Sequence, residues 1–172
     1  DVTHNITNQM VLTYNLPTDT TPLDVQEIRS SGYNAQGLAS QQVIVTYSDI
    51  AKTKQIGVKV IDNTGFSAIT NTGVRVITNY SSVTFQNNDT TKLITAFSGE
   101  LDRQTITVLT ADTRGNALHQ TVLSEGWIVA AGVGAWSFSG MQDITNDSIV
   151  FLVSTQHTNA LNEFGAGVVG YL

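Results

Sequence analysis

Apolar and polar residues alternate along most of this chain, and this period of two constrains its fold more than any other feature. From Met10 to Leu16 every second residue is apolar, with an interruption only at Val11. The same alternation recurs from Val43 to Tyr47 and from Ile56 to Val60. Successive side chains of a β-strand point to opposite faces of a sheet, so the alternation predicts strands with one buried face.

Further candidate strands follow, separated by turn-forming residues such as Asp62-Asn63-Thr64-Gly65 and Ser98-Gly99. They span residues 73–79, 82–87, 92–97, 103–110, 117–123, 126–131, 134–139, 148–154 and 164–171. This spacing predicts an all-β fold, an antiparallel β-sandwich or jelly-roll-like arrangement of about 10 to 12 short strands. Little or no helix is expected, because only residues 22–29 or 49–54 could form a helical turn or two. The run Ile149–Val153 is apolar at every position, which is typical of a central strand covered from both sides.

Composition and charge exclude several classes of function. The 172 residues suffice for one domain with a buried core, and the absence of cysteine excludes disulfides and thiolate metal sites. The net charge is −6, and basic residues cluster only at Lys52, Lys54 and Lys59, so we expect no nucleic-acid binding. No apolar run reaches the roughly 18 residues that a membrane span requires, so we expect no membrane insertion.

The N-terminal segment is predicted to be a separable strand. Pro17 and Pro22 both fall in the stretch 16–23, which divides an arm of residues 1–16 from a single β-sandwich domain of residues 17–172. The arm carries its own alternating apolar residues, Met10, Leu12, Tyr14 and Leu16. It is either the first strand of its own sheet, which local pairing favours, or a strand that adds to a neighbouring subunit.

Motifs for catalysis, cofactors and metals are weak or missing. Residues 165–170 match the G-x-G-x-x-G pattern, but no helix can follow in the two residues that remain, so the match is spurious. His4, His119 and His157 have no metal-ligand spacing, and no G-x-S-x-G nucleophile motif occurs. We therefore expect no enzyme, no cofactor and no metal.

Two tryptophans offer an alternative to a purely structural role. Trp127 and Trp136 lie nine residues apart across Gly132-Val133-Gly134, which places them on the two arms of a hairpin. Burial in the core is the more common fate of such aromatic residues. The glycines between them are expected to pack closely against another backbone or under an aromatic ring. Their flat rings could instead stack on a sugar ring.

Four N-x-[ST] sequons barely exceed chance for this composition, and their acceptors are Asn5, Asn79, Asn88 and Asn146. Asn88 and Asn146 fall in predicted turns and are the better candidates for N-glycosylation.

These observations favour a non-enzymatic structural subunit that binds copies of itself, in an extracellular filament or appendage or in a virion. Only 13% of the residues are charged, and a surface poor in charge and rich in threonine is common on the outside of cells and virions. Such a surface also lacks the usual protection against pairing between sheet edges. The alternative is a carbohydrate-binding module or lectin-like adhesin with glycan partners.

Overall fold

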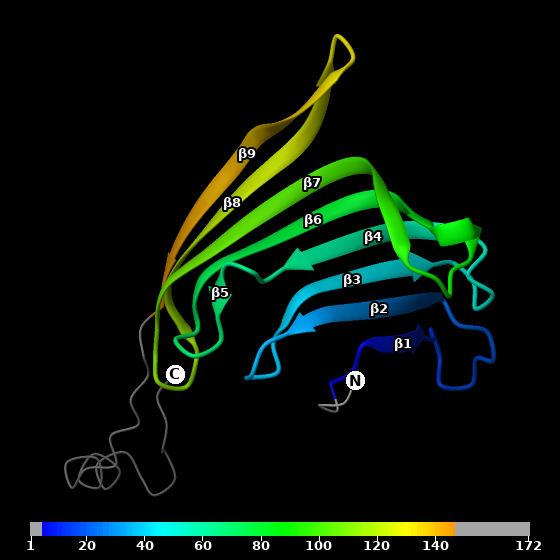
Figure 1. Ribbon diagram of the computed structural model, residues 1–172, viewed down its shortest axis with the longest axis horizontal. Coiled ribbons are helices and arrows are strands. Elements are labelled where there is room, and N and C mark those ends of the chain that lie inside the picture. The colour runs from blue at the N-terminus through cyan, green and yellow to red at the C-terminus, as the bar shows by residue number, and fades with distance from the viewer. Residues whose placement is uncertain (1–4, 147–172) are drawn as a thin grey trace, which may run out of the picture.

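A computed structural model describes residues 5–146, which form one antiparallel sheet (Figure 1). Its strands are β1 (Asn8–Thr13), β2 (Asp24–Tyr33), β3 (Ala39–Tyr47), β4 (Gln55–Asp62), β5 (Phe66–Ser67), β6 (Thr72–Phe85), β7 (Ile94–Ala111), β8 (Ala117–Ala130) and β9 (Val133–Thr145). A short 3-10 turn, η1 (Gln86–Asn88), follows β6. The strand order β1-β2-β3-β4-β6-β7-β8-β9 is a meander, with β5 paired to β6, so β1 and β9 are the edges of the sheet that residues 5–146 form.

The prediction of an all-β antiparallel fold with little helix is confirmed. The sandwich or jelly-roll arrangement stays a prediction, because the described residues form a single sheet. The candidate strands at 148–154 and 164–171, including the apolar run Ile149–Val153, lie outside the described residues.

The strands of the C-terminal half are longer and fewer than predicted. Residues 73–79 and 82–87 belong to the single strand β6, and residues 92–97 and 103–110 belong to β7. The Ser98-Gly99 pair is not a turn, because Gly99 takes a φ of +65° within a strand that continues through it. The β6–β7 register shifts between Asn79 and Tyr80, so a bulge bends the hairpin where the sequence suggested that it ended.

The helical alternative for residues 22–29 is wrong, since β2 runs through them. Val25 and Glu27 are both buried, which shows that the period of two is present. The charged residue Glu27 occupies an inward position, so the apolar alternation of the strand is interrupted in the sequence. Residues 49–54 form bends and a turn rather than a helix.

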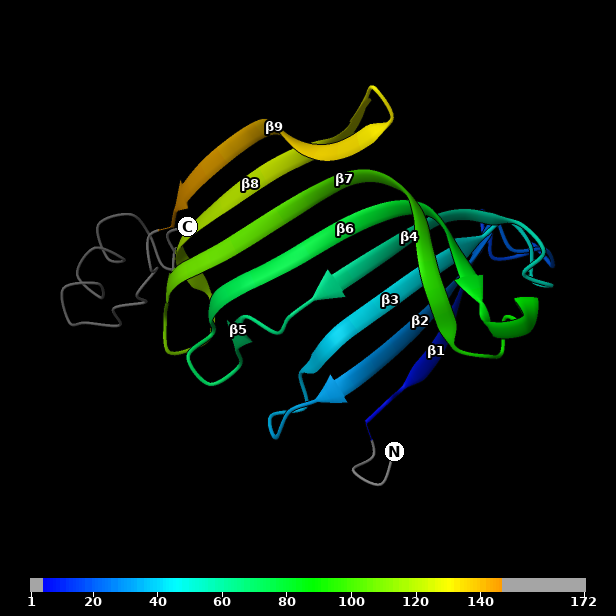
Figure 2. The ribbon, with the colours of Figure 1, turned by 45° about the horizontal axis from the view of Figure 1, so that its top comes forward.

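The hydrophobic core lies on the inner face, defined here as the face that carries Val45 and Val58. Beyond the bulge, the end of the β6–β7 hairpin bends over β2, β3 and β4 (Figure 2). Val83 and Phe85 from this bent end join the buried cluster of Val25, Val43, Val45, Tyr47 and Val58. The bend therefore gives a single sheet a second layer of cover over its N-terminal half.

The inner face continues uncovered across β7, β8 and β9. A row of direct strand partners runs from Thr78 to Arg103, Glu125 and Phe138, which places Phe138 on the same face as the core. Met141 and Phe138 are 61% and 69% exposed. This half of the sheet thus presents large apolar side chains that residues 5–146 do not cover.

Candidate functional site

The free edge of the sheet at β1 is the first candidate site. β1 pairs with β2 of the same chain, with Met10 opposite Glu27 and Leu12 opposite Val25. The segment is thus the first strand of its own sheet, and the proline-flanked stretch 16–23 lies in its connection to β2. Met10 is 52% exposed, whereas Leu12 packs against the core.

The structure does not bring the four predicted contact residues together on one strand. Met10 and Leu12 lie in β1, whereas Tyr14 and Leu16 follow it in the connection and are 43% and 55% exposed. The predicted strand was too long, because the apolar alternation continues to Leu16 whereas β1 ends at Thr13.

Within residues 5–146, the outer edge of β1 has no strand partner for its backbone groups. The Thr7 carbonyl accepts a hydrogen bond from the Ser30 amide of β2. Backbone groups of an antiparallel strand alternate between its two sides, so the amides and carbonyls of Asn8, Met10 and Leu12 point away from β2. β1 contains no charged residue, proline or glycine, which are the usual obstacles to pairing at an edge.

The predicted tryptophan hairpin is confirmed. Trp127 and Trp136 are direct partners across β8 and β9, with ring centroids 5.0 Å apart and an edge-to-face arrangement. A Cβ atom on Gly134 would lie 2.1 Å from the Trp127 indole, so this glycine lets the ring lie flat on the strand. Both tryptophans are half-buried and lie outside the core cluster.

An ion pair completes the tryptophan cluster. Arg103 donates from Nε to Oε2 of Glu125 over 2.8 Å, and its guanidinium lies 4.6 Å from the centre of the Trp136 ring. The guanidinium therefore occupies one face of Trp136. A sugar would have to stack on what remains of the two rings.

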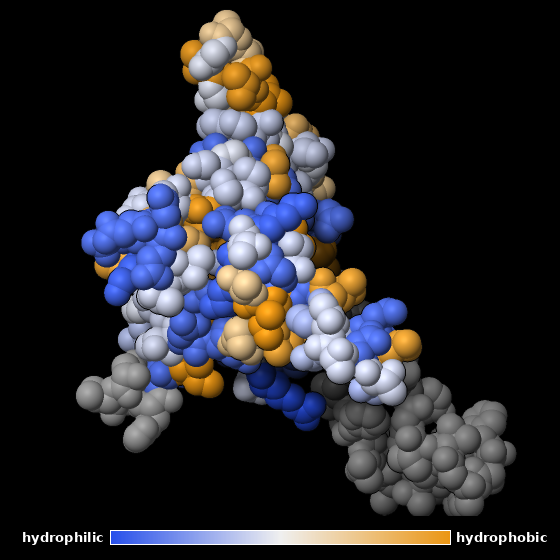
Figure 3. All heavy atoms as spheres, turned by 90° about the vertical axis from the view of Figure 1, so that its right-hand side faces the viewer, coloured by the Kyte–Doolittle hydropathy of each residue, from blue (hydrophilic) through white to orange (hydrophobic). Residues whose placement is uncertain are grey.

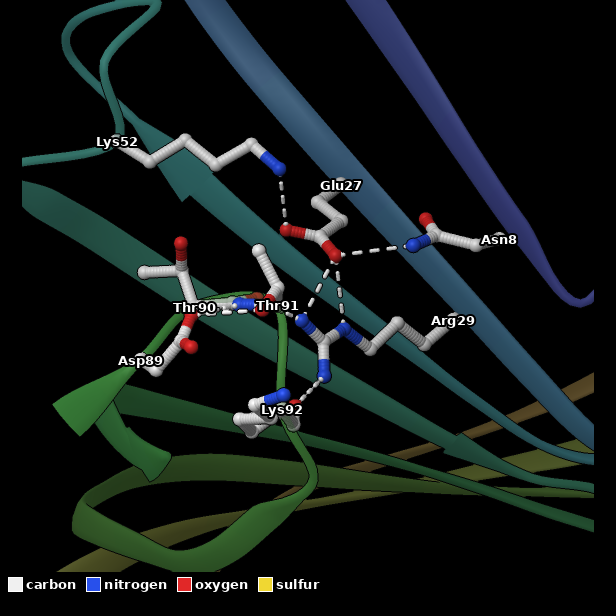
Figure 4. A network of polar contacts seen from close by, with 8 residues as sticks. All are labelled: Asn8, Glu27, Arg29, Lys52, Asp89, Thr90, Thr91 and Lys92. Atoms are coloured by element: carbon white, nitrogen blue, oxygen red, sulfur yellow. Dashed lines mark hydrogen bonds and ion pairs between the residues drawn. The ribbon is translucent and has the colours of Figure 1, made fainter. Parts of the chain in front are cut away.

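A buried carboxylate, Glu27, forms the most connected polar site in the described chain (Figure 4). Oε1 accepts from Nδ2 of Asn8 over 3.2 Å and from Nε of Arg29 over 2.9 Å, and Oε2 lies 2.8 Å from Nζ of Lys52. Arg29 also donates to the carbonyls of Thr90 and Lys92. The network joins β1, β2, the β3–β4 connection and the β6–β7 connection.

The charges of this network determine the protonation of Glu27. Burial alone would raise the pKa of the carboxyl, but the hydrogen bond from Lys52 and the charge and hydrogen bond of Arg29 outweigh it. The resulting pKa lies below the ordinary value of 4.5. The carboxylate is thus ionised and fully engaged, which suits a structural clamp better than an acid or base in catalysis.

Sequence reasoning missed the Glu27 network. The available signal was a glutamate in phase with Val25 on an alternating segment, because an inward charge requires a partner. Its partners Lys52 and Thr90 are far away in the sequence, and no local pattern identifies them.

The sequon asparagines differ in their surroundings. Asn88 is exposed in η1, as expected for an acceptor in a turn. Asn79 lies within β6 and donates from Nδ2 to Asp102 over 2.7 Å. Asn146 is exposed and donates to the Ala117 carbonyl, and Asn5 is half-buried before β1.

Residues 5–146 hold no group of three or more histidine, aspartate or glutamate side chains that could bind a metal ion. His119 forms an exposed contact of 2.7 Å with Asp143. His4, His157 and the glycine motif at 165–170 lie outside the described residues. The described part of the chain also has no helix long and apolar enough to cross a membrane.

Comparison with protein-family models, curated proteins and solved structures found no match to this chain.

Proposed function

We propose that this chain is a non-enzymatic structural subunit of an extracellular or particle-surface assembly, such as a filament, an appendage or a virion, and that its copies bind one another through β-strand contacts. The observation that carries the proposal is the free outer edge of β1. An open sheet leaves a row of unpaired amides and carbonyls at its edge, and this edge has no charge or proline to prevent pairing.

Strand addition is the mechanism that fits this edge. A strand from another copy would bond to the outward groups of Asn8, Met10 and Leu12, while its alternate side chains pack beside Met10. Donation of residues 1–16 into a neighbour is a second form of the same idea, but it would require β1 to leave β2 first. The proposal therefore treats β1 as an acceptor edge.

The uncovered part of the inner face supports association as well. Phe138 and Met141 lie on the face that is buried elsewhere in the sheet, yet each is more than half exposed. Contiguous exposed apolar surface usually marks a contact with another molecule. An assembled state would remove this surface from water.

The test uses proline at two neighbouring positions of β1. In Met10→Pro the lost amide points outward, so the β1–β2 ladder survives and assembly should stop. In Val11→Pro the lost amide points toward β2, so the sheet itself should be destabilised. Light scattering and electron micrographs should show wild-type oligomers or polymers and single chains for Met10→Pro, with circular dichroism as the check on folding. A wild-type protein that stays a single chain at every concentration would refute the proposal.

A second candidate function is binding of carbohydrate at Trp127 and Trp136. The observation in its favour is that two half-buried tryptophans contact each other across β8 and β9, outside the core cluster. Strong quenching of tryptophan fluorescence by iodide, together with hits on a glycan array, would support it. Weak quenching and an array without hits would count against it.

A further inference from the structure

The β8–β9 hairpin projects beyond the rest of the sheet (Figure 1). The last pair between β7 and β8 joins Asp102 to Gly126, and the preceding part of β7 pairs only with β6. Residues 127–136, called the hairpin ribbon below, are therefore two strands with a partner only in each other. Both outer edges of the hairpin ribbon are unpaired within the described part of the chain.

The hairpin ribbon is apolar at its tip, where hydrophobic side chains gather at the top of Figure 3. Residues 128–135 include no charged side chain and no side chain that forms hydrogen bonds. Ile128, Val129 and Val133 are 52%, 67% and 70% exposed. Exposing these apolar side chains to water costs free energy, and an exposed apolar patch of this kind marks a surface that contacts another molecule.

The turn of the hairpin defines which backbone groups are free. Ala131 and Gly132 have φ values of 50° and 79°, which is the pattern of a two-residue type I′ turn. Ala130 and Val133 flank this turn as direct partners. The alternation of an antiparallel pair then orients the amides and carbonyls of Trp127 and Val129 away from β9.

We infer that the hairpin ribbon of one copy docks on the β1 edge of a second copy, with the free edge of β8 beside β1. The inference rests on the proposed function and names the two surfaces that meet. Neither β1 nor residues 127–136 carry a charge, and among residues 5–146 both edges have backbone groups without a partner. The amides of each edge can therefore bond to the carbonyls of the other. A membrane would accept the apolar side chains but would leave the free amides and carbonyls unsatisfied.

The positions of the two edges make the contact intermolecular. β1 begins the strand order and the β8–β9 hairpin ends it, and they lie on opposite sides of the molecule (Figures 1 and 2). One surface of a copy therefore meets a different surface of the next copy. Such a head-to-tail contact leaves one free ribbon and one free β1 edge at the ends, so it propagates into a filament or closes into a ring.

The test blocks each surface separately. Val129→Pro removes an outward amide of the hairpin ribbon, and Val129→Lys places a charge on the same edge as a second way of blocking it. Met10→Pro blocks the β1 edge. Ile69→Lys is the control, because Ile69 is a 75% exposed aliphatic residue between β5 and β6, away from both surfaces.

Each blocked variant should have the mass of one chain by light scattering, whereas Ile69→Lys should assemble like the wild type. An equimolar mixture of Val129→Pro and Met10→Pro should form a dimer and nothing larger, because only one productive contact is possible between them. This complementation would not arise if either variant were simply misfolded.

Three results would overturn the inference. If both Val129 variants assemble like the wild type while Met10→Pro does not, the proposed function stands but the ribbon is not the partner. If the mixture remains single chains, the two surfaces do not meet. If Val129→Lys assembles normally but loses flotation with phosphatidylcholine vesicles, the ribbon contacts lipid instead. A wild-type protein that never assembles would remove the proposed function itself.

Discussion

At the scale of single residues, two buried polar groups on the inner face have opposite effects. Glu27 is 2% exposed and has a cation or amide at each oxygen. Tyr47 is fully buried, and its hydroxyl has no hydrogen-bond partner within residues 5–146. Burial, with the nearby charge of Glu27, raises the pKa of Tyr47 to about 12. Glu27 stabilises the fold through its partners. Tyr47 stabilises it by packing its ring in the core, although its buried hydroxyl opposes folding.

Glu27→Gln should lower the free energy of unfolding by about 3 kcal/mol, because Arg29 and Lys52 would lose their buried counter-charge. The urea midpoint followed by circular dichroism measures this. Asp24→Asn is the matched control, since Asp24 holds only an exposed hydrogen bond from Thr13 and should change stability by about 0.5 kcal/mol or less.

The effect of Glu27→Gln should depend on pH. The pKa of Glu27 is lower in the folded chain than its ordinary value of 4.5, so its stabilising contribution is present above 4.5 and is lost as the pH falls through the folded pKa. The difference in stability between wild type and Glu27→Gln should thus shrink below about pH 4. A difference that grows on acidification would contradict the assigned network.

Tyr47→Phe should leave the fold intact and raise the free energy of unfolding by about 1 kcal/mol. The substitution keeps the ring in the core and removes a hydroxyl that is buried without a partner, which is a costly state. Thermal unfolding of the two proteins provides the comparison. A loss of stability would mean that the hydroxyl does have a partner in solution.

Asn88 should be the preferred glycosylation site when the chain is secreted from a eukaryotic cell. Asn88 is exposed in η1, whereas the Asn79 amide is engaged with Asp102 inside the β6–β7 ladder. Peptide mass spectrometry should find glycan at Asn88 and none at Asn79. The reverse distribution would be incompatible with this structure.

At the scale of elements, the bent β6–β7 hairpin decides where the core lies. The strand does not end at Ser98-Gly99, because the ladder continues past a glycine with positive φ and shifts register between Asn79 and Tyr80. Phe85 and Phe97 reach the core side of the sheet only because of that bend. The bent hairpin thus converts a flat meander into a sheet that covers part of its own face.

Gly99→Ala should lower the free energy of unfolding by about 1–2 kcal/mol, since alanine is strained at a φ of +65°. Its Cβ would also lie 2.1 Å from Oγ of Ser81, although that side chain can rotate away. Gly57→Ala is the control, because a Cβ there would have no atom within 4 Å. Equal midpoints for the two variants in urea would show that the bend does not depend on Gly99.

At the scale of the whole molecule, an open sheet with low charge leaves apolar surface and two edges for contacts with other molecules. Only 13% of the residues are charged, and neither β1 nor the hairpin ribbon carries a charge. The contact between copies would consist of backbone hydrogen bonds and apolar packing. Salt screens ion pairs but leaves these interactions in place.

The assembled mass should therefore be nearly the same in about 0.05 M and about 1 M sodium chloride. Light scattering across this range provides the measurement. If the assembly fell apart at the higher concentration, ion pairs between copies would hold it together, and the contact would lie elsewhere than at β1 and the ribbon.

The sequence by itself determined the all-β antiparallel character, because alternation with a period of two is a local signal that each strand carries alone. It also placed Trp127 and Trp136 on the two arms of one hairpin, because glycines lie between them. Their direct pairing came from the structure. Local pairing of successive strands favoured the alternative in which β1 belongs to its own sheet, and β1 does pair with β2.

Only the tertiary structure decided which candidate strands merge, where the sheet bends and what surrounds Glu27. Glu27 contacts Lys52 and Asn8, which are distant from it in sequence. Gly99 has a positive φ within a strand that pairs with β6, and no local pattern predicts this. The inner half-face at Phe138 is exposed for the same reason, because the bent hairpin covers β2 to β4 and reaches no further. Local sequence patterns identify strands, but which face of a sheet is buried depends on how the strands are arranged in space.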